Sequence, residues 1–158
     1  MLRLVSISIA TLMVIAGAAL AEDSKKVELS AVPQKVVDTA MKEVSGFKPT
    51  TANTEMEDGK TVYELQGMAG DKKVEVDVME DGTLDEVETE VEMGALPEAV
   101  SKAVMDKMPN FKPSKIEESR RTAGTYYEIE GADGSNKIDI EIKADGSSMK
   151  AEKLASGS

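Results

Sequence analysis

One stretch of the chain occurs twice, and this duplication limits the folds that the sequence can adopt. Residues 61–82 and residues 125–146 share a Tyr-Glu pair, two glycines and a closing Asp-Gly, and every shared position recurs 64 residues later. In the first copy three Val alternate with Glu75 and Asp77, and in the second copy three Ile alternate with two acids. Alternation with a period of two is typical of an antiparallel sheet that has one packed face and one face in water. The sequence therefore predicts two related sheet-forming units.

A short helix is predicted before each copy. Val32-Pro33 and Leu96-Pro97 suit helix starts, because the N–H that proline lacks would be unpaired in the first turn anyway. Apolar residues then recur at helical spacing: Val36, Val37, Ala40, Met41 and Val44 in the first unit, and Val100, Val104, Met105 and Met108 in the second. We expect turns at the Phe-Lys-Pro segments and at Gly67, and further strands at residues 50–57, 84–91, 114–121 and 148–153. The predicted fold class is α+β: two tandem repeats, each one α-helix packed on an antiparallel β-meander of about four strands.

The N-terminal segment has the pattern of a signal peptide. Arg3 precedes a mostly apolar run, and Ala19-Leu20-Ala21 has the small-x-small form of a signal-peptidase site. An uncleaved membrane anchor is the alternative, although the apolar run is short for a spanning helix. We predict a signal peptide at residues 1–21, a first repeat at residues 22–90 and a second repeat at residues 91–158, in a periplasmic or secreted protein. Because no Gly/Ser/Pro-rich linker separates the repeats, we expect them to pack as one rigid body.

The residue types present exclude several kinds of active site. The chain has no His and no Cys, which removes Ser-His-Asp and Cys-His nucleophilic sites and His/Cys ligation of zinc or haem. It also has no phosphate-binding glycine-rich loop. Glu75 with Asp77, and Asp139 with Glu141, could in principle form carboxylate pairs for acid–base chemistry, but a solvated sheet face explains them more simply. We expect a protein that is not an enzyme and binds no cofactor.

The chain is strongly acidic. It holds 30 acids against 19 bases, a net charge of −11, and the excess of acids falls in the first repeat. This charge argues against nucleic acid or an anionic membrane surface as the partner, because both are bound through basic surfaces. The acids either provide solubility or face a basic protein or peptide partner, and the sequence leaves both explanations open.

Five acids are the candidate partner-binding residues. Glu86, Glu88 and Glu90 point to one side of their strand, and Glu75 and Asp77 join them if this strand pairs with the preceding one. The second repeat has a lysine at the position that matches the first of these glutamates, so the repeats differ in surface charge. Such a difference is expected of a surface that serves a partner, and equally of neutral drift.

No metal site is predicted. Calcium would suit the oxygen-rich composition best, but each Asp-Gly pair is spaced as a hairpin turn and none continues as a calcium-binding loop. Thioethers can bind Cu(I), and the chain contains 10 Met. We expect Met41, Met105 and Met108 to fill the core instead, because they lie on the apolar faces of the two helices.

The order of these motifs resembles the PepSY-like family, and more specifically the tandem-repeat architecture of the β-lactamase-inhibitor-protein-like group. The resemblance rests on Val32-Pro33, Leu96-Pro97, the Phe-Lys-Pro segments, the Tyr-Glu strands, the alternating third strands and the closing Asp-Gly pairs, and it covers residues 27–153. It implies an exported protein whose helices pack on an antiparallel sheet and which binds or inhibits other proteins, including peptidases and β-lactamases. The chain departs from the inhibitor in having no Cys, and so no disulfides, and no Trp.

The expected function is that of an exported, non-enzymatic binding module, an inhibitor or modulator of an envelope protein such as a peptidase. Its partner is expected to be a protein or peptide of basic character. The alternative is a calcium- or cation-responsive envelope protein.

Overall fold

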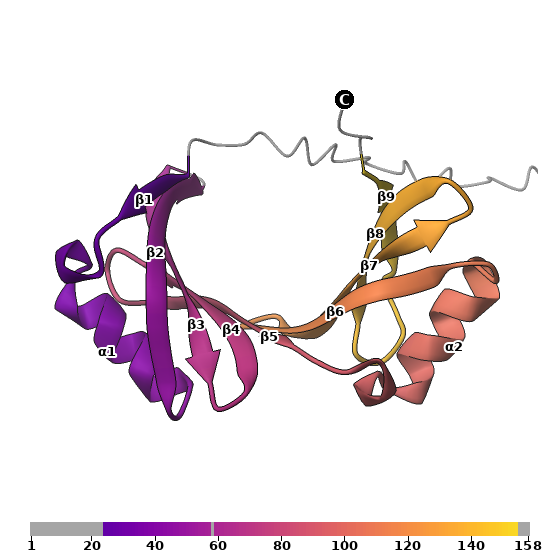
Figure 1. Cartoon of the computed structure of the whole chain (residues 1–158), viewed down its shortest axis with the longest axis horizontal. Coiled ribbons are helices and arrows are strands. Elements are labelled where there is room, and N and C mark those ends of the chain that lie inside the picture. Colours follow the sequence, from indigo (N-terminus) through magenta and orange to yellow (C-terminus); the bar gives the residue numbers. More distant parts are fainter. Residues whose placement is uncertain (1–23, 58, 155–158) are drawn as a thin grey trace, which may run out of the picture.

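The computed structural model describes residues 24–57 and 59–154, and over these residues the protein is an α+β fold with one nine-stranded antiparallel sheet and two α-helices. Strands that are neighbours in the sheet are also neighbours in the chain (Figure 1). The strands are β1 (Lys25–Val27), β2 (Phe47–Glu57), β3 (Lys60–Ala69), β4 (Lys72–Met79), β5 (Leu84–Glu90), β6 (Lys112–Arg121), β7 (Gly124–Asp133), β8 (Asn136–Lys143) and β9 (Lys150–Lys153). The helices are α1 (Gln34–Glu43) and α2 (Glu98–Lys107), and short 3-10 turns precede them at Leu29–Ala31 and Met93–Ala95. The α+β class predicted from the alternation is confirmed.

Both helices begin directly after a proline, as predicted. Pro33 precedes α1 and Pro97 precedes α2. α1 buries Val36 and Ala40 in a core with β2 to β5, and α2 packs in a second core with β6 to β8. The core side chains are mostly Val and Ile, each of which stabilises the fold by roughly 1.5–3 kcal/mol when fully buried.

The sheet is continuous across the predicted boundary between the repeats. β5 pairs with β6 from Glu86, opposite Arg121, to Glu90, opposite Glu117. The chain between these two strands forms α2 and its preceding turn, and then returns to the sheet beside the strand that it left. The sequence left open whether the two sheets merge, and the structure has them as one.

Both helices lie on the same face of this sheet. Val87 of β5 packs in the core beneath α1 and pairs with Arg120 of β6, and directly paired residues of an antiparallel sheet share a face. Arg120 accordingly reaches Glu43 at the end of α1, where it donates to Oε2 and to the carbonyl oxygen, each at 3.4 Å. The sheet bends at β5 and β6, and α1 and α2 cover the outer side of its two halves (Figure 1). Within residues 24–57 and 59–154, the opposite face carries no helix.

The first Phe-Lys-Pro segment differs from the prediction, because it forms part of a strand and not a turn. Residues 47–49 begin β2, and a bulge follows between Pro49 and Thr51. The carbonyl of Lys48 comes so close to β3 that a Cβ at Gly67 would overlap it. Gly67 was predicted at a turn, but it lies within β3 at a point where only glycine leaves room for the neighbouring backbone. The second Phe-Lys-Pro segment likewise runs into β6.

Two methionines that were expected in the core lie at the surface. Met41 is 47% exposed and Met105 is 68% exposed, whereas Met108 packs against the second core. α1 rests on the sheet along Val36 and Ala40, and the next residue on a helix points about 100° away. The buried stripe of α1 is therefore narrower than the apolar face that the sequence predicted.

The start of the described chain adds a strand that the sequence did not predict. Residues 24–26 are polar, yet Lys25–Val27 pairs with residues 52–54 of β2. Polar side chains suit this position because an edge strand exposes most of its surface.

The predicted signal peptide, residues 1–21, lies outside the described residues. Within residues 24–57 and 59–154, neither helix has the length and apolar character needed to cross a membrane.

Candidate binding face

The five acids predicted to bind a partner lie together on the side of the sheet opposite α1 and α2, which we call the free face. β4 and β5 pair so that Glu75 lies opposite Glu88 and Asp77 lies opposite Glu86, and Glu90 follows on the same side. Each of the five residues is half-buried, so this is not the fully solvated face that simple alternation suggests. Their placement on one face agrees with the prediction, and their role in binding stays a prediction.

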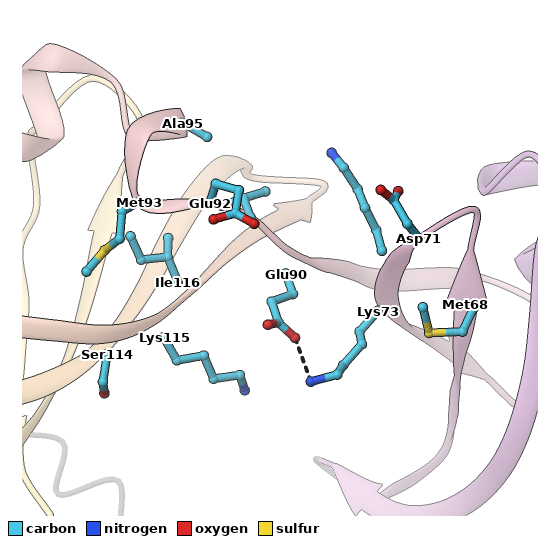
Figure 2. Close-up of a pocket in the computed structure, with 12 residues that line it drawn as sticks. Met68, Asp71, Lys73, Glu90, Glu92, Met93, Ala95, Ser114, Lys115 and Ile116 are labelled. Carbon is cyan, nitrogen blue, oxygen red and sulfur yellow. Dashed lines mark ion pairs between the residues drawn. The ribbon is translucent and has the colours of Figure 1, made fainter.

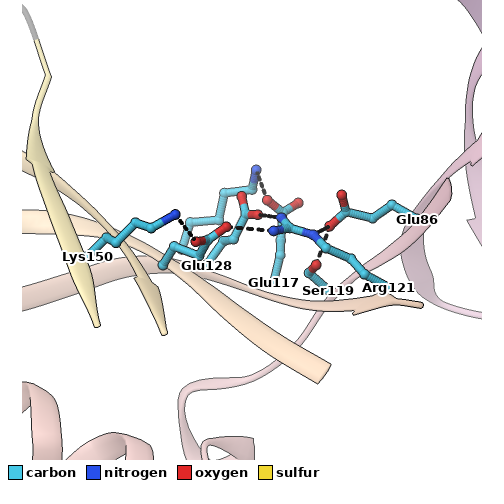
Figure 3. Close-up of polar contacts among 8 residues, drawn as sticks. Glu86, Glu117, Ser119, Arg121, Glu128 and Lys150 are labelled. Atoms are coloured by element: carbon cyan, nitrogen blue, oxygen red, sulfur yellow. Dashed lines mark hydrogen bonds and ion pairs between the residues drawn. The ribbon is translucent and has the colours of Figure 1, made fainter. Parts of the chain in front are cut away.

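An arginine from the second half of the sheet bonds to one of these acids, Glu86, and to two further glutamates (Figure 3). Arg121 donates from Nε to Glu86 Oε1 at 2.8 Å, from Nη2 to Glu128 Oε1 at 2.5 Å and from Nη1 to Glu141 Oε2 at 2.6 Å. Ser119, which is fully buried, donates its hydroxyl to the same oxygen of Glu86. One guanidinium thus joins carboxylates from β5, β7 and β8.

Sequence reasoning missed Arg121 and Ser119, although a signal for them was present. Alternation along the predicted strand at residues 114–121 already places Glu117, Ser119 and Arg121 on one side. The pairing of β5 with β6 was not predicted from the sequence. Without this pairing, nothing places Ser119 and Arg121 beside Glu86. This pairing joins strands on either side of a helix, which a local pattern does not encode.

Asp77 is the most perturbed carboxyl of the free face. Burial raises its pKa to about 9, and the negative charges of Glu75 and Glu64 act in the same direction. Its Oδ1 is buried and has no hydrogen-bond partner among the described residues. A buried carboxyl oxygen without a donor favours the neutral form of the acid, and with a pKa of about 9 Asp77 holds its proton at neutral pH.

The pKa values of neighbouring carboxyls are raised for the same reason. Burial raises the pKa of Glu88 to about 8, and the charges of Glu128 and Glu86 add to this. Burial also raises the pKa of Glu128 to about 7, although the charge of Arg121 opposes it. For Glu75 burial again raises the pKa, while a hydrogen bond donated by Gln66 at 2.7 Å opposes the rise.

Two adjoining clefts lie where the two halves of the sheet meet, and Figure 2 shows the residues that line the first. Their volumes are about 450 Å³ and about 470 Å³, and Met68, Lys73, Glu90 and Lys115 line both. Lys73 Nζ lies 2.9 Å from Glu90 Oε2, and Lys115 Nζ lies 2.7 Å from Glu117 Oε2. The two lysines that line both clefts are therefore already paired with acids.

The chemistry available on the free face is the binding of positive charge. Carboxylate oxygens of Glu86, Glu88 and Glu128 lie within 4.8 Å of one another, a spacing that a cation with oxygen ligands could use. Two of these three glutamates hold Arg121, so a metal ion would compete with its guanidinium. Basic side chains of another molecule can pair with the carboxyls that Arg121 does not contact, and they then do not compete with its guanidinium.

No family model matches the sequence, and no curated protein matches it. Several solved structures are similar in fold. A DUF2874 family protein from Bacteroides uniformis is 12% identical with a TM-score of 0.64, and the match covers 77% of this chain and 88% of that one. A protein from Bacteroides eggerthii, provisionally named as periplasmic, is 13% identical with a TM-score of 0.62 over 77% and 88% of the two chains.

A BLIP-like protein from Bacteroides fragilis is 19% identical with a TM-score of 0.63, and the match covers 80% of this chain and 89% of that one. Identities this low are informative about the fold alone. They agree with the predicted resemblance to the β-lactamase-inhibitor-protein-like group, while the PepSY-like assignment stays a prediction. The fold of this chain is that of the BLIP-like protein.

Proposed function

We propose that this protein is an exported, non-enzymatic binding module that holds another protein or peptide against the free face. The observation that carries the proposal is that α1 and α2 lie on the other side, so one face of the described nine-stranded sheet is open to a partner. The signal sequence expected at residues 1–21 supports export, as does the provisional periplasmic name of the B. eggerthii protein. The absence of His and Cys from the chain supports binding over catalysis.

We further propose that the partner is basic and that it contacts the five acids of β4 and β5: Glu75, Asp77, Glu86, Glu88 and Glu90. Charge complementarity favours a lysine- or arginine-bearing surface, because the acids here outnumber the cations that pair with them. A role as inhibitor or modulator of an envelope protein such as a peptidase is supported by the BLIP-like name of the B. fragilis structure. In this proposal residues 22–90 and 91–158 are two copies of one PepSY-like unit that share the sheet.

The test is capture of the partner from an envelope extract. The variant Glu75→Gln/Asp77→Asn/Glu88→Gln removes three carboxyls of the free face, and it leaves Glu86 in place because Glu86 holds Arg121. We expect capture by the wild-type protein to weaken at high salt, since exposed charge pairs are screened. We expect the variant to bind about tenfold more weakly, which corresponds to about 1.4 kcal/mol.

The matched control is Glu28→Gln/Glu80→Gln/Glu98→Gln. These three glutamates are exposed and lie outside the free face, so their loss changes the charge of the protein but not that surface. The proposal requires the control to capture the partner as the wild type does. Equal loss in both variants would assign binding to overall charge, and no loss in either would dismiss the free face.

A second candidate is a calcium- or cation-responsive envelope protein. The convergence of oxygens from Glu86, Glu88 and Glu128 favours it. An ion that binds only the folded state must raise the melting temperature, so melts with and without millimolar calcium test it. A rise that Glu88→Gln abolishes would support this function, and an unchanged melting temperature would dismiss it.

A further inference from the structure

We propose that binding of a lysine- or arginine-bearing segment to the free face releases protons from carboxyls of β4 and β5. The inference rests on the binding role proposed above and concerns the regulation of that same surface. It makes the affinity for the partner depend on the pH of the compartment in which the two proteins meet.

Acids surround Asp77 on this face. Glu64 faces it from β3, Glu75 lies on its own strand, and Glu86 and Glu88 face it from β5. Among the described residues no lysine or arginine forms an ion pair with Asp77. Carboxyls packed this closely cannot all ionise without a counter-ion, so some of them retain protons in the free protein.

Glu88 has a similar environment. Glu75 faces it from β4, Glu117 and Lys115 face it from β6, and Glu128 faces it from β7. Lys115 and Arg121 are the cations nearby: the Lys115 ammonium lies 2.7 Å from Glu117, and Arg121 bonds to Glu86, Glu128 and Glu141. Glu88 therefore has acid neighbours on three strands, and the nearby positive charges are committed to other acids.

A carboxylate of the same face that does meet a guanidinium behaves differently. Burial opposes the ionisation of Glu141, but hydrogen bonds donated by Arg121 and Lys150 lower its pKa overall. Glu128, which also meets Arg121, has a pKa that burial raises to about 7, whereas Asp77 and Glu88, which no cation of the described chain contacts, have pKa values of about 9 and about 8. A cation brought by a partner to Asp77 and Glu88 would lower their pKa in the same way, and at neutral pH they would lose their protons.

The size of the effect follows from linkage. Each proton released on binding makes the association constant rise about tenfold per pH unit, over the range in which the free protein holds that proton. Burial places this range around neutral pH and above for Asp77 and Glu88, whose pKa values are about 9 and about 8. The adjoining clefts of about 450 Å³ and about 470 Å³ provide room for an extended segment, and Glu75 and Glu117, which face Glu88, line the second of them.

The test uses the mature protein and a peptide of about ten residues that alternates arginine with alanine. Calorimetry at pH 7 in two buffers of different ionisation enthalpy measures the protons released per peptide. We expect the release of about one proton or more, and an affinity that rises about tenfold per pH unit near neutral pH for each proton released. The variant Asp77→Asn/Glu88→Gln mimics the protonated carboxyls, and it should release fewer protons than the wild type and bind with a weaker pH dependence. Its control, Glu80→Gln/Glu98→Gln, should release protons as the wild type does.

The outcomes separate this inference from the proposed function. Binding of the peptide with equal heats in the two buffers would overturn the inference and leave the proposed function in place. Undiminished proton release in the Asp77/Glu88 variant would overturn it as well, because the protons would come from other groups. If the peptide fails to bind at any pH, the basic occupant and this inference are both overturned, and capture from the envelope extract decides the proposed function independently.

Discussion

At the scale of single residues, Asp77 makes the stability of the protein depend on pH. Its pKa is about 9 in the folded protein against an ordinary value of 3.8, because it is buried beside other acids. Between these two values the folded state holds a proton that the unfolded state has lost. This contribution to stability is therefore fully present below about pH 4 and is lost as the pH rises toward 9.

The variant Asp77→Asn cannot ionise, so it should escape this loss. We expect it to be more stable than the wild type at pH 8, by an amount on the order of 1–3 kcal/mol, and the gap should be smaller at pH 5. Thermal melts followed by circular dichroism at the two pH values measure this, with the exposed Asp71→Asn as the control. A gap that does not change between pH 5 and pH 8 would show that Asp77 ionises normally.

A second residue-scale prediction concerns the close approach of β2 to β3. A Cβ at Gly67 would overlap the carbonyl of Lys48, whereas a Cβ at Gly94 would meet no atom within 4 Å. We expect Gly67→Ala to destabilise the protein by about 1–3 kcal/mol or more and Gly94→Ala to change stability by less than about 0.5 kcal/mol. Urea titrations of both variants compare them. Equal stabilities would mean that β2 can move away from β3 at little cost.

At the scale of elements, the connection between β5 and β6 is where sequence reasoning reached its limit. Alternation of side chains is local to each strand. It placed Glu86 and its neighbours on one side of β5, and it could also have placed Arg121 on one side of β6. Which strands pair depends on how the two halves pack. Gly67 is a similar case: its strand was predictable, but the reason for glycine lies in the bulge of β2, which no local pattern contains.

Arg121 should hold this connection more strongly than its neighbour Arg120. The Arg121 side chain is 28% exposed and bonds to three carboxylates, whereas the Arg120 side chain is 46% exposed and makes longer contacts with Glu43. We expect Arg121→Met to cost about 1–3 kcal/mol at pH 8 and less at pH 5, where protonation of the carboxyls relieves their repulsion. Arg120→Met should cost at most about 1 kcal/mol. Equal costs in chemical denaturation would contradict the role of Arg121 in joining the halves.

At the scale of the whole molecule, one sheet that runs through both halves predicts one unfolding transition. Neither core is large, and the pairing of β5 with β6 ties them together. We expect the urea transition followed by circular dichroism to coincide with that followed by tyrosine fluorescence in a Tyr63→Phe variant. The remaining tyrosines, Tyr126 and Tyr127, then report the second half alone. Two separate midpoints would mean that the halves unfold independently.

The same architecture places both helices on one face and leaves the other face for a partner, which is the central claim. Site-specific photo-crosslinking in an envelope extract tests it most directly. A photoreactive residue replaces Lys73, whose side chain is 74% exposed beside the clefts, or Lys102, whose side chain is 71% exposed on α2. We predict a crosslinked partner from position 73 and none from position 102. Crosslinking from position 102 alone would place the partner on the helical side and contradict the account.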